Sequence, residues 1–159
     1  MATLELATVG GKIKASMLNA IIGVLTPATN FSPAIANFTS AGSAEVIVAR
    51  YWRTGNVVKV HITGTLGGSP VTVGDLTLTV PIPIDITGMS LNNDLLNGTV
   101  GLFDVGTGQF TGVVRVVDAN TVRIMRSTTT SLSPVSNTTP FTWTAGDKIS
   151  ISFDYPVVP

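Results

Sequence analysis

The chain contains no cysteine among its 159 residues. Disulfide bonds and thiolate metal sites within it are therefore excluded, and the redox compartment stays open. Charge is also scarce, because nine Lys and Arg and nine Asp and Glu make up 11% of the residues and cancel to a net charge of zero. A basic surface for nucleic acid is not expected from this balance, so we predict no nucleic-acid partner.

Histidine is almost absent, since His61 is the only one. Any Ser-His-Asp triad in this chain would have to use it, and it falls in the middle of a strand pattern on the polar side. The sequence has no HExxH pattern, no GxSxG pattern and no GKS or GKT phosphate loop. We therefore predict that the chain is not an enzyme and holds no cofactor and no metal.

Carboxylates are few and scattered along the chain. Asp85 and Asp94 lie in one predicted loop, where they could form the acid pair that a glycosidase needs. Asp75, Asp118 and Asp147 stand beside Gly, Ala or Asn, a context in which short acidic side chains bond their own backbone in turns. A hydrolase is therefore the least favoured of the function classes considered below.

Long apolar runs are missing, and the run at residues 17–25 is too short to span a bilayer, so we expect no membrane partner. Ser16 is a suitable N-cap for a helix over this run, and Pro27 marks its end. The apolar face of such a helix is wide and must be covered, either by the rest of the chain or by other copies of it. The residues predicted for this oligomer or partner interface are Met17, Leu18, Ile21, Ile22 and Leu25.

Residues 44–64 predict two strands joined by a turn at residues 54–56. On the second strand, apolar residues at 58, 60 and 62 alternate with polar residues at 59, 61 and 63, which is typical of a strand with one wet face. Neither side of the first strand is plainly polar. We therefore expect the first strand to be covered on both faces.

Further strands are predicted at five places, separated by turn signals: residues 71–80, 98–104, 109–117, 121–126 and 148–155. A long loop over 84–97 and a polar Ser/Thr loop over 127–140 lie between them. This pattern favours an all-β fold, a jelly-roll-like antiparallel β-sandwich of about eight strands, preceded by a short N-terminal arm and helix. The expected organisation is an attachment region over residues 1–43 and a β-sandwich domain over residues 44–159.

Recognition-type residues are concentrated at Tyr51, Trp52 and Arg53. Such residues are enriched at interface hot spots, and aromatic rings also stack on sugars. We predict a role in the core or in a subunit interface, with ligand binding as the alternative. Low charge beside 44% apolar residues also predicts that part of the surface is hidden against other subunits. A further expectation is that three arginines pair with carboxylates across a subunit boundary: Arg115, Arg123 and Arg126.

Several short motifs resemble those of the small β-sandwich modules of tailed-bacteriophage virion proteins. Residues 51–64, YWRTGNVVKVHITG, are similar to the "Y-x-R-x-G-x-x-V-x-V-x-x-x-G" hairpin that opens such modules, and residues 78–83, LTVPIP, to their "L-x-[LV]-P-[IV]-P" strand ending. The likeness runs through FTW at 141–143 to ISFDY at 151–155, and covers residues 44–156. Ahead of it, GGKIKASMLN at 10–19 resembles the "G-x-K-I-x-A-S-x-L-N" lead-in of the group.

The resemblance implies a virion surface protein, usually a homotrimer, made in the host bacterial cytoplasm and found in minor tail proteins, fibre tips or capsid decorations. Because no shaft sequence joins the arm to the β-module, we favour a capsid decoration, or cement, protein that binds the major capsid protein. The alternative is a tail appendage or minor tail protein that binds tail proteins and contacts the host receptor or a surface glycan through its β-module, at Tyr51, Trp52 and the Ser/Thr loop over residues 127–140. Whether the chain sits on the head or the tail stays open at this point.

Overall fold

The computed structural model describes residues 27–36, 46–69 and 74–159. The regular elements in these ranges are all β-strands, which confirms the all-β prediction. The predicted helix and its interface residues, Met17, Leu18, Ile21, Ile22 and Leu25, lie outside the described residues.

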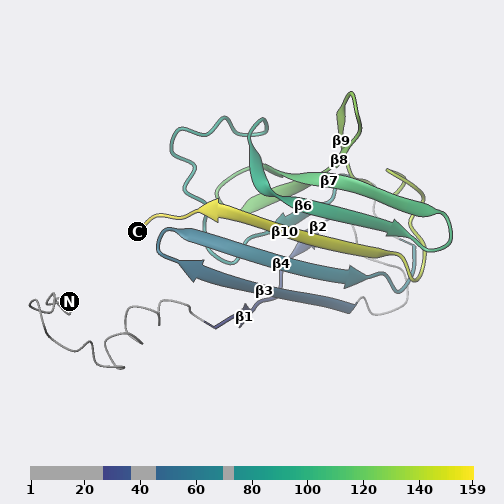
Figure 1. Cartoon of the computed structure of the whole chain (residues 1–159), viewed down its shortest axis with the longest axis horizontal. Coiled ribbons are helices and arrows are strands. Elements are labelled where there is room, and N and C mark those ends of the chain that lie inside the picture. The colour runs from purple at the N-terminus through teal and green to yellow at the C-terminus, as the bar shows by residue number, and fades with distance from the viewer. Residues whose placement is uncertain (1–26, 37–45, 70–73) are drawn as a thin grey trace, which may run out of the picture.

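The described strands form one antiparallel sheet in the order β1-β3-β4-β10-β6-β7-β8-β5-β2, with β9 paired to β8 (Figure 1). Their bounds are β1 Thr29–Asn30, β2 Ile35–Ala36, β3 Val46–Thr54, β4 Val57–Thr65, β5 Thr77–Thr79, β6 Leu95–Asp104, β7 Gly108–Val116, β8 Thr121–Ser127, β9 Leu132–Pro134 and β10 Lys148–Pro156. The last strand of the chain, β10, is a central strand between β4 and β6.

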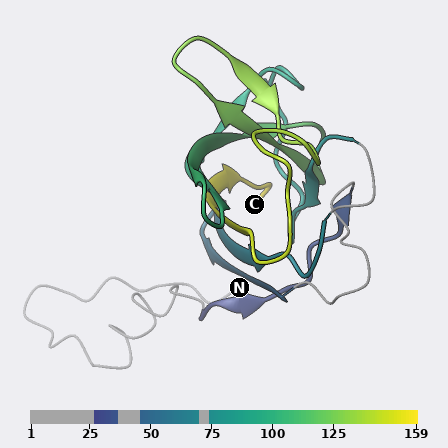
Figure 2. The same ribbon diagram turned by 90° about the vertical axis from the view of Figure 1, so that its right-hand side faces the viewer.

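The sheet curls because one short segment is paired at both of its ends. β1 pairs with β3 at one edge of the sheet, and β2 pairs with β5 at the other edge. Only residues 31–34 separate β1 from β2 in the chain, so the two edges of the sheet must lie close together. Figure 2 shows the resulting half-barrel nearly end-on. The expected jelly-roll sandwich is not confirmed, since the strands belong to a single curled sheet rather than to two facing sheets.

The core fills the inside of the curl, and period-two alternation on the strands supplies it. On β4 the side chains of residues 58, 60 and 62 are buried, and on β10 those of residues 149, 151, 153 and 155, as the sequence predicts. Trp143 is also fully buried, and its ring packs against the ring of Phe141 with the two centroids 4.3 Å apart. Burial of these apolar surfaces is the main force that holds the sheet curled.

The prediction that the first strand is covered on both faces is wrong. Val46 and Val48 on one face of β3 are 65% and 45% exposed, whereas Ala49 on the opposite face is buried. Apolar composition alone does not cover a strand, because cover depends on whether another layer lies over that face. In a single curled sheet the outer face of β3 has no described layer above it.

The predicted loop over residues 84–97 is too long at its C-terminal end. Leu95 and Leu96 already belong to β6 and pair with Arg115 and Val114 of β7. The register of these two strands then shifts between Leu96 and Val100, which is the signature of a bulge. Asn and Gly at residues 97 and 98 therefore mark a bulge inside the strand rather than the end of a loop.

The Ser/Thr loop over residues 127–140 is less superficial than predicted. It contains β9 and the fully buried Val135. The N–H of Val135 donates to the carbonyl oxygen of Ile124 over 2.9 Å, and its carbonyl oxygen accepts from the N–H of Leu76 over 2.7 Å. One apolar residue in a polar run is thus enough to fasten the loop to the core.

Candidate functional site

The outer face of the central strands carries a row of polar and aromatic side chains. Trp52 of β3 lies opposite Lys59 of β4, which lies opposite Asp154 of β10, which in turn lies opposite Asn97 of β6. The Asn97 side-chain amide donates to Asp154 Oδ1 over 2.7 Å. Strand pairing therefore assembles one row from residues that are far apart in the sequence.

A second row runs beside the first on the same face. The same strand pairings place Arg50, His61, Ser152 and Thr99 opposite one another. Together the two rows form the outer-face rows, whose side chains offer hydrogen-bond donors and acceptors around one half-buried indole, that of Trp52. This combination suits a ligand with many hydroxyl groups, because an aromatic ring packs against its apolar side while polar groups orient it.

The three recognition-type residues of the sequence do not share a face. Tyr51 and Arg53 point to the side of β3 opposite to Trp52, as strand alternation requires. The Tyr51 ring packs edge-on against that of Phe31, with centroids 5.9 Å apart. Arg53 Nε donates to the Gly55 carbonyl oxygen over 2.9 Å, so both residues make contacts inside the described fold.

The three arginines of β7 and β8 also have different surroundings. Arg123 Nε lies 3.3 Å from Asp75 Oδ2 in the same chain. Arg126 lies over the Phe110 ring, with its Cζ atom 5.3 Å from the ring centroid. Arg115 lies directly opposite Arg123, and its buried Nε has no hydrogen-bond partner in the described part of the chain. Arg123 thus has an ion-pair partner within its own chain, and the pairing of the three arginines with carboxylates across a subunit boundary stays a prediction.

Asp85 and Asp94 each bond the backbone of their own turn. Asp85 Oδ1 accepts from the N–H of Thr87 over 3.0 Å, and Asp94 Oδ2 accepts from the N–H of Ser90 over 2.7 Å. Two hydrogen bonds from Thr87 hold the pKa of Asp85 below its usual value, and the bond from the Thr87 side chain contributes more than the bond from its backbone. Both bonds stabilise the charged form of the carboxylate. Among residues 27–36, 46–69 and 74–159, no three His, Cys, Asp or Glu side chains gather into a possible metal site.

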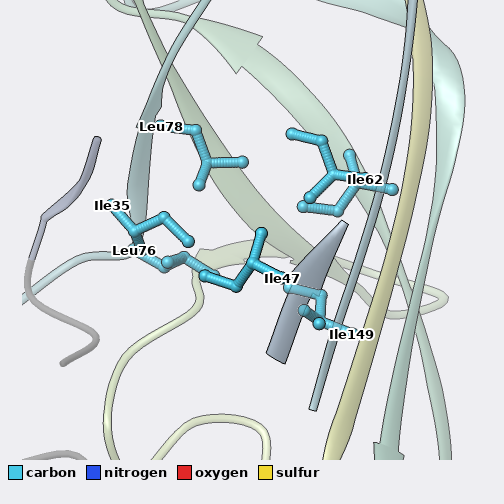
Figure 3. Close-up of a pocket in the computed structure, with 8 residues that line it drawn as sticks. Ile35, Ile47, Ile62, Leu76, Leu78 and Ile149 are labelled. Carbon is cyan, nitrogen blue, oxygen red and sulfur yellow. The ribbon is translucent and has the colours of Figure 1, made fainter. Parts of the chain in front are cut away.

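The seam where the curled sheet closes contains a narrow apolar cavity (Figure 3). Ile35, Leu76 and Leu78 face Ile47, Ile62 and Ile149 across it. The volume of the cavity that the centre of a water-sized sphere can reach is about 20 Å³. An apolar space of this size has no polar groups to hold water, so it serves to close the seam rather than to bind a ligand.

Sequence reasoning found Trp52 and His61 but not the rows to which they belong. Asp154 and Asn97 were predicted as ordinary strand or loop residues, since a sequence pattern shows the polar side of one strand and not the neighbouring strand. The missing information was that β10 inserts between β4 and β6.

No helix long and apolar enough to cross a membrane occurs in the ranges that the structure describes. Comparison of the chain with models of known protein families, with curated proteins and with solved structures finds no match.

Proposed function

We propose that the chain is a structural surface protein of a tailed-phage virion, a homotrimer that decorates the capsid and stabilises it by binding the major capsid protein. The observation that supports this most is where the resembling motifs lie. Residues 51–64 make the β3–β4 hairpin, with Gly55 at a φ of 58° in its turn, and residues 151–155 lie in the central strand β10. These two motifs therefore lie in strands β3, β4 and β10 of the sheet.

A decoration protein must keep its shape under load, and the described sheet suits that task. Its C-terminal strand β10 is hydrogen-bonded on both sides, to β4 over nine residue pairs and to β6 over seven. A central antiparallel strand of this length opens only when the whole sheet opens. The jelly-roll arrangement of the resembling modules belongs to the same proposal.

The proposal is tested with gold-labelled antibody against this protein on intact virus particles, viewed by electron microscopy. Labels spread over the head are expected for a capsid decoration. Labels confined to the tail would replace it with the second candidate below, and particles without labels would overturn the virion proposal altogether.

The second candidate is a tail appendage whose β-module contacts a host receptor or surface glycan, and the outer-face rows favour it. Trp52 lies there among side chains that can bond sugar hydroxyl groups, in the arrangement described above. A glycan array with the wild-type chain and the Trp52→Ala variant tests it. Binding that disappears in the variant supports this candidate, and silence of the wild type on bacterial surface glycans counts against it.

A further inference from the structure

The first part of β3 is a strand edge without a neighbour in the described ranges. β1 pairs with Arg50 and Tyr51 of β3, and the N–H of Phe31 then donates to the Ala49 carbonyl oxygen over 3.1 Å. Ser32 and Pro33 follow, and proline has no N–H to continue such a ladder. The chain therefore leaves β3 after Phe31, and we call residues 46–48 the free β3 edge.

The register of the hairpin shows which backbone groups this edge presents. A two-residue turn joins β3 to β4, so Thr54 and Val57, which flank it, exchange hydrogen bonds. Bonded pairs then recur at every second residue, which directs the N–H and C=O of Ile47 away from β4. The bond from Phe31 to Ala49, two residues further along, has the same phase. Among the described residues, the N–H and the C=O of Ile47 on this edge therefore have no strand partner.

Two exposed valines flank these groups on the outer face of the sheet. Val46 is 65% exposed and Val48 is 45% exposed. Natural edge strands are commonly protected by lysine, proline, a bulge or a covering loop, and residues 46–48 carry none of the first three. Open hollows of about 250 and 280 Å³ adjoin the edge, one of them lined by Phe31, Pro33 and Ile47, so another strand has room to approach.

We propose that the free β3 edge pairs antiparallel with the same edge of a second copy of this chain, about a two-fold axis at Ile47. The two Ile47 residues would exchange two backbone hydrogen bonds. Val46 of each copy would then lie opposite the partner subunit's Val48 on the outer face, with Cβ atoms about 4.5–5.5 Å apart.

The sequence of the edge is what identifies the occupant as a second copy. Val-Ile-Val reads the same in both directions, so antiparallel pairing about its centre matches each residue type with itself or with another valine. A two-fold contact places residue i against j and j against i, so the patch must be compatible with itself, and Val46 against Val48 meets this condition in both copies. No charged side chain lies within residues 46–48 to oppose the approach.

The contact goes beyond the proposed function, which specifies no strand edge. A two-fold contact joins copies in pairs, so the assembly must contain an even number of chains. If the trimer of the proposed function also forms, two trimers would join through these edges into six chains. The tests below use purified protein and no particles, so their failure is separate from failure of the virion proposal.

Native mass spectrometry of the full chain is the first test. The wild type is expected to contain two or six chains, and the Val46→Lys/Val48→Lys double variant is expected to have half that mass. Val57→Lys is the matched control, because Val57 is 46% exposed on the outer face of the neighbouring strand but away from the edge. An odd number of chains in the wild type, or an unchanged mass in the double variant, would overturn the proposal.

A second test reads the register and does not depend on a destabilising change. The chain has no cysteine, so Val46→Cys and Val48→Cys variants introduce the only thiol in each. After the two are mixed and oxidised, a disulfide-linked dimer is expected, because residues 46 and 48 of different copies lie opposite each other within disulfide reach. Neither variant alone should link efficiently. A mixture that forms no more linked dimer than the separate variants would reject this pairing.

Discussion

Asp147 accepts a hydrogen bond from the backbone N–H of Val105 over 2.9 Å, and this bond ties the turn before β10 to the turn between β6 and β7. The other carboxylate oxygen accepts from the N–H of Thr144 over 2.6 Å. Asp147 is fully buried, and a carboxylate in such a place is stable only where donors replace the water it has lost. One side chain therefore holds two loops at the same end of the sheet.

Replacement of Asp147 by Ala should lower the free energy of unfolding by about 2–4 kcal/mol, because it leaves the N–H groups of Val105 and Thr144 without acceptors. Urea unfolding followed by fluorescence measures the change. Asp118→Ala is the control, since Asp118 is exposed and its side chain accepts a bond from the N–H of Asn120 in its own turn. Its expected loss is under about 1 kcal/mol. Equal losses in the two variants would contradict the role given to Asp147.

Tyr155 should make the stability of the fold fall at high pH. Its hydroxyl donates to the Ile82 carbonyl oxygen over 2.9 Å, and burial raises its pKa from the usual 10.0 to about 12. The folded chain therefore keeps this proton after the unfolded chain has released it. The contribution is complete below pH 10 and is lost as the pH rises from 10 to 12, at a rate of roughly 1 kcal/mol per pH unit.

The free energy of unfolding of the wild type and of Tyr155→Phe, measured between pH 8 and pH 12, checks this. The variant should be less stable by about 1 kcal/mol at pH 8, where the bond to Ile82 is lost. Because the wild type loses about 2 kcal/mol between pH 10 and pH 12 and the variant does not, the two curves should cross at about pH 11. Curves that stay parallel over the whole range would show that Tyr155 is not the group responsible.

Gly112 should not tolerate a side chain. A Cβ atom built there would meet the carbonyl oxygen of Met125 and lie 3.3 Å from the Val100 Cβ, and the backbone of β8 cannot move aside. Gly112→Ala is expected to cost about 1–3 kcal/mol of stability. Gly101→Ala on the neighbouring strand is the control, because its Cβ would meet the Phe103 ring at 2.9 Å, and a ring can rotate. Similar losses in both urea titrations would refute the distinction.

The opposite orientations of Tyr51 and Trp52 predict different effects on stability. Tyr51→Ala removes the edge-on contact with Phe31 and should lower the free energy of unfolding by about 1–3 kcal/mol. Trp52→Ala changes a half-buried ring on the outer face and should cost less. Urea midpoints of the two variants test this, and a larger loss for Trp52 would place it in the core instead.

The amino-acid sequence by itself determined the local structure of this protein. Alternation on residues 58–63 and 148–155 identified two central strands and their buried sides, and turn residues at 55 and 106 identified two hairpins. These features depend on neighbours one to four residues away, which a sequence displays directly. The same reading failed at Leu95, where pairing with Arg115 extends a strand that local composition assigns to a loop.

Only the tertiary structure decided the order of the strands, and with it the two candidate surfaces. The outer-face rows exist because β10 inserts between β4 and β6, and the free β3 edge exists because the chain turns away from β3 at Pro33 toward β5. Both outcomes depend on which long-range pairing buries the most apolar surface. That is a property of the whole curled sheet, so no local pattern in the sequence carries it.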